Sequence, residues 1–112
     1  MKTVTIDGVK FIEEKTDGMP YVMIRTYSAG VHCGLLKSRN GKEVELLESI
    51  RIWKWSGAAS LSQLAMEGTN DTENCKFGMP ISTSLILTEA IEIILMTETA
   101  IQSIKKVKSW KQ

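Results

Sequence analysis

A short basic and aromatic stretch carries the residues of this sequence that are best suited to binding a ligand. It reads RIWKW over residues 51–55. If Ile50–Trp55 is a β-strand, alternation places Arg51, Trp53 and Trp55 on one face. A guanidinium can grip a phosphate through two parallel hydrogen bonds, and an indole can stack a nucleobase. The same face could instead be a core layer or a subunit interface, and each tryptophan taken singly fits those alternatives better.

A second arginine shares a predicted strand with aromatic residues. Over Tyr21–Tyr27, alternation places Arg25 and Tyr27 on one face. The small residues at 28–30 and 56–59 would let backbone N–H groups approach an anion. Together these features predict a pocket for a small phosphorylated ligand, built where strand ends meet the start of a helix. The alternative, that each arginine covers an aromatic ring for stability alone, is equally compatible with the sequence.

The side chains that common enzyme classes require are missing or scattered. The sequence has no P-loop, GxGxxG, HExxH, paired CxxC or GxSxG motif. His32 is the only histidine, and it would point to the opposite strand face from Cys33, which disfavours a catalytic dyad. Cys33 and Cys75 lack zinc-site spacing and are expected to be reduced. We therefore predict a binding protein rather than an enzyme, with no metal and no cofactor.

Length, composition and charge narrow the classes of protein further. The 112 residues fit one domain spanning 1–112, and 43% hydrophobic with 24% charged residues is typical of a folded globular chain. The net charge of +1 excludes a global field that would attract duplex DNA. The sequence has neither a secretory signal nor 18 consecutive apolar residues. We expect a cytoplasmic protein that does not enter a membrane.

An antiparallel sheet must position the binding residues, and turn signals define its strands. Asp7-Gly8 suits a two-residue type I′ turn, and Asn40-Gly41 is the strongest turn signal in the chain. Asp17–Pro20 breaks the pattern, and Glu48-Ser49 is a short polar break before the tryptophan strand. The predicted strands are Val4–Ile6, Val9–Glu13, Tyr21–Tyr27, Val31–Leu36, Glu43–Leu47 and Ile50–Trp55.

Two helices are predicted in the second half of the chain. Ser60 and Gln63 form a capping box, and Gly68 ends a helix of about two turns. Thr97 is a candidate N-cap for a C-terminal helix with lysines toward its end. The predicted fold is therefore α+β, with a twisted antiparallel sheet, a short helix after the tryptophan strand and a C-terminal helix.

Two segments between these helices are less regular. Residues 69–84 form a predicted loop in which Phe77 is the only aromatic residue. We expect Phe77 to anchor the loop on the core, and the alternative is a ring that covers a ligand. Leu85–Met96 fits a helix or a strand broken at Glu89, and its β-branched residues favour the strand.

Three stretches of the sequence resemble a known family. They read RTYSAGVHCG at residues 25–34, RIWKWSGAASL at 51–61 and LTEAIEI at 87–93. From about Tyr21 to Trp110 the chain is similar to the first Thoeris anti-defence family of phage proteins. The resemblance implies a molecular sponge that binds glycocyclic ADP-ribose, the signal made by a TIR-domain enzyme of the bacterial Thoeris system. The sponge does not cleave the signal, and the host effector stays inactive.

The resemblance also carries expectations about partners and location. Some members bind cyclic oligonucleotides at a separate site, which makes cyclic di- or trinucleotides further candidate ligands. The family forms dimers that build into hexamers with ligand at subunit junctions, so a homodimer or hexamer in the cytoplasm of an infected bacterium is expected. The alternative is a non-catalytic structural or protein-interaction phage module in which the tryptophans form only a subunit interface. A hydrolase is a third, weaker possibility.

The expected ligand-binding residues follow from side-chain chemistry rather than from a map of the family. Arg25 and Arg51 would hold phosphates, and Trp53 or Phe77 would stack adenine. The remaining candidates are Tyr27 beside Arg25, Ser28 and Gly30 for close approach of the ligand, and Lys105 and Lys108 for positive charge across a dimer interface.

Overall fold

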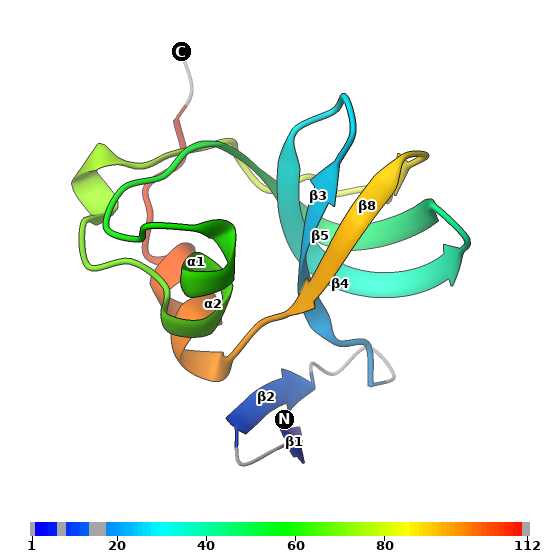
Figure 1. The fold of residues 1–112 in the computed structure, drawn as a ribbon, viewed down its shortest axis with the longest axis horizontal. Helices are drawn as coiled ribbons and strands as arrows, with labels where there is room; N and C mark the ends of the chain where they lie inside the picture. The colour runs from blue at the N-terminus through cyan, green and yellow to red at the C-terminus, as the bar shows by residue number, and fades with distance from the viewer. Residues whose placement is uncertain (1, 7–8, 14–17, 111–112) are drawn as a thin grey trace.

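A six-stranded antiparallel sheet with two helices on one side forms the main body of the fold (Figure 1). The computed structural model describes residues 2–6, 9–13 and 18–110. The predicted α+β class is confirmed. The strand order is β6-β5-β4-β3-β8, with β7 also paired to β5. These strands are β3 (Tyr21–Thr26), β4 (Val31–Asn40), β5 (Glu43–Lys54), β6 (Lys76–Phe77), β7 (Leu85–Leu87) and β8 (Ala90–Leu95).

One edge of the long strand β5 pairs with two short strands of the curled sheet. β6 pairs with β5 near Ile52 and Lys54, whereas β7 pairs with it at the other end, over Val44–Leu46. The amide of Ala90 donates to the carbonyl of Lys42 at 2.9 Å, which brings the start of β8 to the β4–β5 turn. The curled face encloses a hydrophobic core of Val22, Ile24, Val44, Leu46, Leu87 and Ala90.

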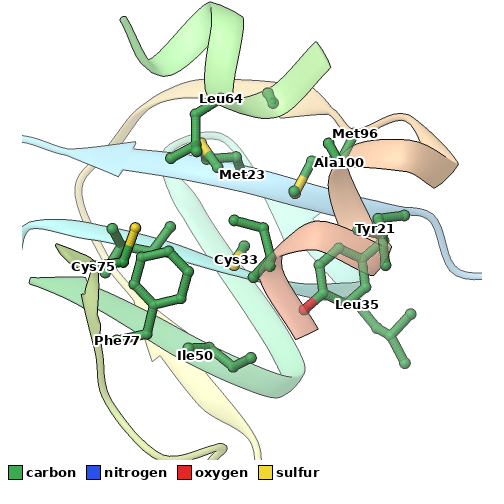
Figure 2. Packing of buried hydrophobic residues seen from close by; sticks show 14 residues of the cluster. Tyr21, Met23, Cys33, Leu35, Ile50, Leu64, Cys75, Phe77, Met96 and Ala100 are labelled. Atoms are coloured by element: carbon green, nitrogen blue, oxygen red, sulfur yellow. The ribbon is translucent and has the colours of Figure 1, made fainter. Parts of the chain in front are cut away.

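The opposite face of the sheet packs on the helices α1 (Leu61–Glu67) and α2 (Glu98–Lys105). Figure 2 shows side chains from β3, α1 and α2 meeting in this larger core. Both predicted N-caps are confirmed: Ser60 Oγ accepts from the Gln63 amide at 3.1 Å, and Thr97 Oγ1 accepts from the Ala100 amide at 3.1 Å. The core residues include Tyr21, Met23, Cys33, Leu35, Ile50, Leu64, Phe77, Met96, Ala100 and Ile101.

One predicted strand boundary is wrong, because Glu48-Ser49 does not interrupt the sheet. Residues 43–54 form one strand, and the pairing with β4 shifts register between Cys33 and Leu35. Glu48 has a φ of +52°, so it forms a β-bulge that keeps the ladder intact on both sides. Gly34 lies opposite, where an added Cβ would come within 2.9 Å of both Leu47 O and Ser49 Cα. A side chain at position 34 would prevent this close approach.

Other predicted elements can be compared directly with the structure. β1 (Lys2–Ile6) and β2 (Val9–Glu13) pair antiparallel as expected, and the Asp7-Gly8 turn lies outside the described residues. The preference for strand over 85–96 is confirmed by β7 and β8, which are separated at residues 88–89. The predicted loop 69–84 contains the 3-10 turn η1 (Thr72–Asn74) and strand β6. None of the helices in the described ranges is long and apolar enough to cross a membrane.

Candidate functional site

The register of the sheet separates the two arginines that were expected to share one pocket. Arg25 pairs with Val31, and Val31 pairs with Ile52, so these three residues lie on the same face. Arg51 precedes Ile52 and therefore lies on the opposite face, as does Trp53. The prediction of one pocket containing both arginines is wrong within a single chain. Which residues of two strands share a face depends on the register of their pairing, and the sequence of one strand does not fix that register.

Arg25 lies in an acidic neighbourhood near the β3–β4 turn. Its Nε is 3.3 Å from Glu92 Oε1 on the adjacent strand β8. Ser28 Oγ donates to Glu89 Oε1 at 2.7 Å. Two carboxylates therefore already occupy the polar groups that were expected to meet a phosphate here.

Tyr27 and Gly30 complete this turn. The ring of Tyr27 is 77% exposed and borders a shallow depression beside Lys42 and Glu89. Gly30 has a φ of +83°, and its carbonyl accepts from Thr26 Oγ1 at 2.8 Å. The glycine is needed for the shape of the turn, since residues with a Cβ rarely adopt this backbone conformation.

A cation–aromatic cluster lies at the β6 edge of the sheet and consists of Arg51, Trp53, Lys76 and Trp110. We call it the Trp53 cluster. The Arg51 Cζ lies 5.2 Å from the Trp53 ring centroid, and Lys76 Nζ lies 5.0 Å from that of Trp110. The two indoles meet edge to face, with centroids 6.3 Å apart and planes at 77°. Trp53 is 58% and Trp110 48% exposed, so both rings offer free surface to a ligand.

The partner of Trp53 in this cluster is Trp110, not Trp55 as the strand alternation predicted. β5 ends at Lys54, and the partly buried Trp55 packs against the helix-side core with its Nε1 donating to Ala58 O at 3.2 Å. Trp110 reaches the cluster because its amide donates to Phe77 O at 2.8 Å. That backbone contact joins residues far apart in sequence, and no local pattern signals it.

Arg51 differs from the other two arginines in its contacts. Arg25 is ion-paired with Glu92, and Arg39 Nε donates to Gly41 O at 3.0 Å. Among the described residues no carboxylate lies within ion-pair distance of Arg51 or Lys76. A half-buried guanidinium and an exposed ammonium beside two indoles form a local site for an anion that carries a flat ring.

Phe77 and Lys105 lie at a different place, in a cavity between the sheet and the end of α2. The cavity has a volume of about 230 Å³ and apolar walls that include Tyr21 and Ile50, with Glu48 and Lys105 also lining it. Phe77 is 1% exposed and belongs to the core, so the expectation that it anchors its loop is confirmed. Lys105 Nζ lies 5.5 Å from the centroid of the Tyr21 ring. Lys108 is exposed.

The second small-residue stretch, residues 56–59, contacts the following loop. Ser56 Oγ donates to Asp71 Oδ2 at 2.7 Å, and Asn74 donates to the same carboxylate. These hydrogen bonds, first from Ser56 and then from Asn74, lower the pKa of Asp71. The amide of Ser56 points at Cys75 Sγ, 3.4 Å away. This stretch therefore holds the 69–75 loop in place.

His32 and Cys33 point to opposite faces, as predicted, and both are fully buried. Burial lowers the pKa of His32, and the nearby charge of Arg51 lowers it as well. Burial raises the pKa of the Cys33 thiol to about 12. Both cysteines are free, and no metal-binding group of three or more His, Cys, Asp or Glu side chains occurs within the described part of the chain.

These features describe an α+β protein with a curled antiparallel sheet and an exposed cation–aromatic cluster at one sheet edge. The chain belongs to the family described as "Domain of unknown function (DUF6948)", whose model matches residues 19–104. The match includes Arg51, Trp53 and Lys76 and ends before Trp110. Comparison with curated proteins and with solved structures gave no match.

Proposed function

We propose that this protein binds a cyclic ADP-ribose-type signal, glycocyclic ADP-ribose, and sequesters it without cleaving it. By lowering the free signal in the cytoplasm of an infected bacterium, it would keep the Thoeris effector inactive. The resemblance of the RTYSAGVHCG and RIWKWSGAASL stretches to the Thoeris anti-defence family supports the identity of the ligand. The Trp53 cluster supports its chemical class.

The observation that carries this proposal is the exposure of two indoles beside cations without a carboxylate partner among the described residues. A cyclic ADP-ribose isomer offers an adenine ring and a diphosphate. The ring stacks on the free face of Trp53 or Trp110, a contact worth about 1–3 kcal/mol per base. The diphosphate meets Arg51, whose planar guanidinium suits bidentate contact with phosphate oxygens, and Lys76 adds a second positive charge.

Assembly and a wider ligand range are part of the same proposal. We propose a homodimer or hexamer, in which subunit contacts would complete the site around the Trp53 cluster and the C-terminal lysines would add charge. Cyclic di- and trinucleotides carry the same combination of flat bases and phosphates, and they are the second ligand class to test. Light scattering after size-exclusion chromatography, with and without ligand, measures the assembly directly.

The direct test is isothermal titration calorimetry of the purified protein with glycocyclic ADP-ribose, followed by recovery of the ligand after heat denaturation. Sequestration predicts saturable binding and release of chemically intact ligand, identified by mass spectrometry. Lack of binding contradicts the proposal, and recovery of a hydrolysed product would instead indicate an enzyme.

Charge-removing variants locate the site. Arg51→Gln should weaken binding by about tenfold or more, because a charge-assisted contact to phosphate is lost. Arg39→Gln is the matched control, since Arg39 is an exposed arginine outside the Trp53 cluster, and it should bind like the wild type. Arg25→Gln distinguishes the two arginine sites. If Arg25→Gln abolishes binding and Arg51→Gln does not, the ligand lies at the β3–β4 turn instead.

The second candidate function is a non-catalytic interaction module in which Trp53 and Trp110 are covered by another protein subunit. The observation that favours it is the exposed apolar surface of these two rings. For such a module, Trp53→Ala would change the oligomeric state without affecting any nucleotide affinity. For a nucleotide sponge, the same variant loses nucleotide affinity.

A further inference from the structure

Behind the Trp53 cluster, three buried polar atoms have no hydrogen-bond partner among the residues that the structure describes. They are His32 Nδ1, Ser49 Oγ and Arg51 Nε. His32 and Ser49 are both 0% exposed. Leaving a buried polar atom unpaired is destabilising, so three on one face call for a common explanation.

Strand pairing places the three side chains next to each other. His32 and Arg51 are directly paired across β4 and β5, so their side chains lie side by side on the curled face of the sheet. Ser49 precedes Arg51 by two residues on β5 and shares its face. The three side chains are therefore neighbours on the sheet face that also carries Trp53.

The hydrogen-bonding roles of these atoms can be assigned. His32 Nε2 lies 2.9 Å from the carbonyl of Ala29, which can only accept, so Nε2 carries a proton and donates. Because burial keeps the imidazole neutral, Nδ1 has no proton and is an acceptor. Arg51 Nε–H is a donor, and the Ser49 hydroxyl can donate or accept. The group that fits must accept from Arg51 and donate to His32.

A water molecule meets these requirements, and an anion that carries no proton, such as a diphosphate ester, does not. Such an anion cannot donate to His32 Nδ1, and the lone pair of this nitrogen would repel it. Water donates twice and accepts twice, and buried waters typically make about three hydrogen bonds, which is the number of unpaired atoms here. The three atoms are also buried, so a bound nucleotide cannot reach them directly.

We propose that one internal water molecule joins His32 Nδ1, Ser49 Oγ and Arg51 Nε, and that His32 and Ser49 are thereby positioning residues for Arg51. The water fixes the inner edge of the guanidinium, which lies over Trp53 with its Cζ 5.2 Å from the ring centroid. The outer nitrogens of Arg51 are then held toward solvent. The positioning role rests on the proposed function, because it matters only if Arg51 binds an anionic ligand.

The first experiment needs no ligand. In a ¹⁵N NMR spectrum, the Nε–H of Arg51 in the wild-type protein should give a resolved signal that exchanges slowly with solvent. The signal is assigned by its loss in Arg51→Lys. Ser49→Ala should accelerate the exchange severalfold, and a high-resolution crystal structure should show a water within hydrogen-bond distance of all three atoms. Fast exchange in the wild type, or a crystal structure without this water, overturns the proposal.

Two substitutions of His32 then separate positioning from stability. His32→Asn places an amide oxygen near the position of Nδ1 and keeps the acceptor for the water, but loses the bond to Ala29. His32→Gln places an amide nitrogen near Nε2 and keeps that bond, but loses the acceptor. We expect His32→Gln to bind glycocyclic ADP-ribose about tenfold more weakly than the wild type, and His32→Asn to stay within about threefold.

The outcome also separates the positioning role from the proposed function. If the wild type does not bind the nucleotide, the proposed function fails, while the NMR and crystal results still decide whether the water exists. If the wild type binds and affinity follows only the free energy of unfolding of the two His32 variants, the positioning role is wrong. If His32→Asn retains affinity despite lower stability, the positioning role is supported.

Discussion

At the scale of single residues, the contacts of each arginine decide what it can bind. Arg25 and Arg51 have the same chemistry and similar sequence surroundings, each near an aromatic residue in a strand. One is ion-paired with Glu92, whereas the other lies over Trp53 with no carboxylate within ion-pair distance among the described residues. The negative charge of Glu92 opposes an anionic ligand at Arg25, whereas an anion can approach Arg51 without meeting a paired carboxylate.

Gly34 is a residue whose replacement tests the packing of the sheet. In Gly34→Ala the new methyl group would lie 2.9 Å from Leu47 O and from Ser49 Cα, and backbone atoms cannot move aside cheaply. We expect the free energy of unfolding, measured by urea denaturation, to fall by about 2 kcal/mol or more.

Gly78→Ala is the control for this prediction. The nearest atom to a Cβ at Gly78 is Trp53 Nε1 at 3.6 Å, an ordinary contact. The control should remain within about 0.5 kcal/mol of the wild type. An equal loss of stability in both variants would show that the close approach at Gly34 is not responsible.

His32 predicts a specific pH dependence of stability. Its pKa in the folded protein lies below the ordinary 6.5, chiefly because of burial. The unfolded chain therefore binds a proton before the folded protein does as the pH falls. The stabilising contribution is complete above pH 6.5 and is lost progressively below it, at up to about 1.4 kcal/mol per pH unit.

The measurement compares the wild type with His32→Gln, which cannot titrate in this range. Urea unfolding between about pH 7.5 and 5 should show the stability difference between the two proteins shrinking below pH 6.5. Carboxylates common to both proteins cancel in the difference. Parallel stability curves would mean that burial does not shift the pKa of His32.

Strand alternation predicted which residues share a face within one strand, but not which residues meet across strands. The shared face of Arg51 and Trp53 and the opposed faces of His32 and Cys33 follow from a period of two. The pairing of His32 with Arg51 depends on a register that contains irregularities between Cys33 and Leu35 and between Leu36 and Ser38. A shift of one residue changes every cross-strand neighbour, and no single-strand pattern fixes it.

At the scale of elements, helix ends were predictable because their signals are local. Ser60, Gly68 and Thr97 act within a few residues of their own positions, and all three bound the helices as expected. Strand β6 and its pairing with Trp110 were not predictable. β6 contains only two residues and gains its partners from β5 and from the C-terminal segment. Tertiary contacts rather than local preference create such an element.

Thr97 joins the two helices and should matter more than an ordinary cap. Its Oγ1 accepts from the Ala100 amide at the start of α2 and donates to Met66 O in α1 at 2.6 Å. Thr97→Val keeps the shape but leaves both groups without their partner. We expect a loss of about 2 kcal/mol in urea unfolding, against about 1 kcal/mol for Ser60→Ala, which removes only a cap.

Thr97→Ser is the matched control for this prediction. Serine retains the hydroxyl and loses only a methyl group, so it should lie closer to the wild type than Thr97→Val. If Thr97→Val is no more destabilising than Thr97→Ser, the two hydrogen bonds of the Thr97 hydroxyl contribute no more than its methyl contact, which contradicts the prediction.

At the scale of the whole molecule, two cores lie on opposite faces of one curled sheet, and the exposed Trp53 cluster lies at its β6 edge. The helix-side core anchors Phe77 just inside this edge, and the enclosed core lies on the face that carries Arg51 and Trp53. If the cluster binds a ligand as proposed, strands held in place by these cores would lower the entropy lost on binding. The cavity beside Phe77 is lined by Tyr21, Leu35 and Ile50 of the helix-side core, and none of the four cluster residues lines it.

The distribution of charge over the molecule predicts selectivity for compact anions. With a net charge of +1, the chain has no extended positive field, whereas the Trp53 cluster concentrates two cations at one edge. A long polyanion gains affinity by neutralising many phosphates at once, and one small cluster cannot provide this. A cyclic nucleotide needs only a local contact and a stacked base.

At about 0.15 M salt, titration calorimetry should detect glycocyclic ADP-ribose binding, whereas fluorescence anisotropy should detect no binding of a short labelled DNA duplex. Comparable affinity for the duplex would show that a broader positive surface is present and that the Trp53 cluster is not the main anion site.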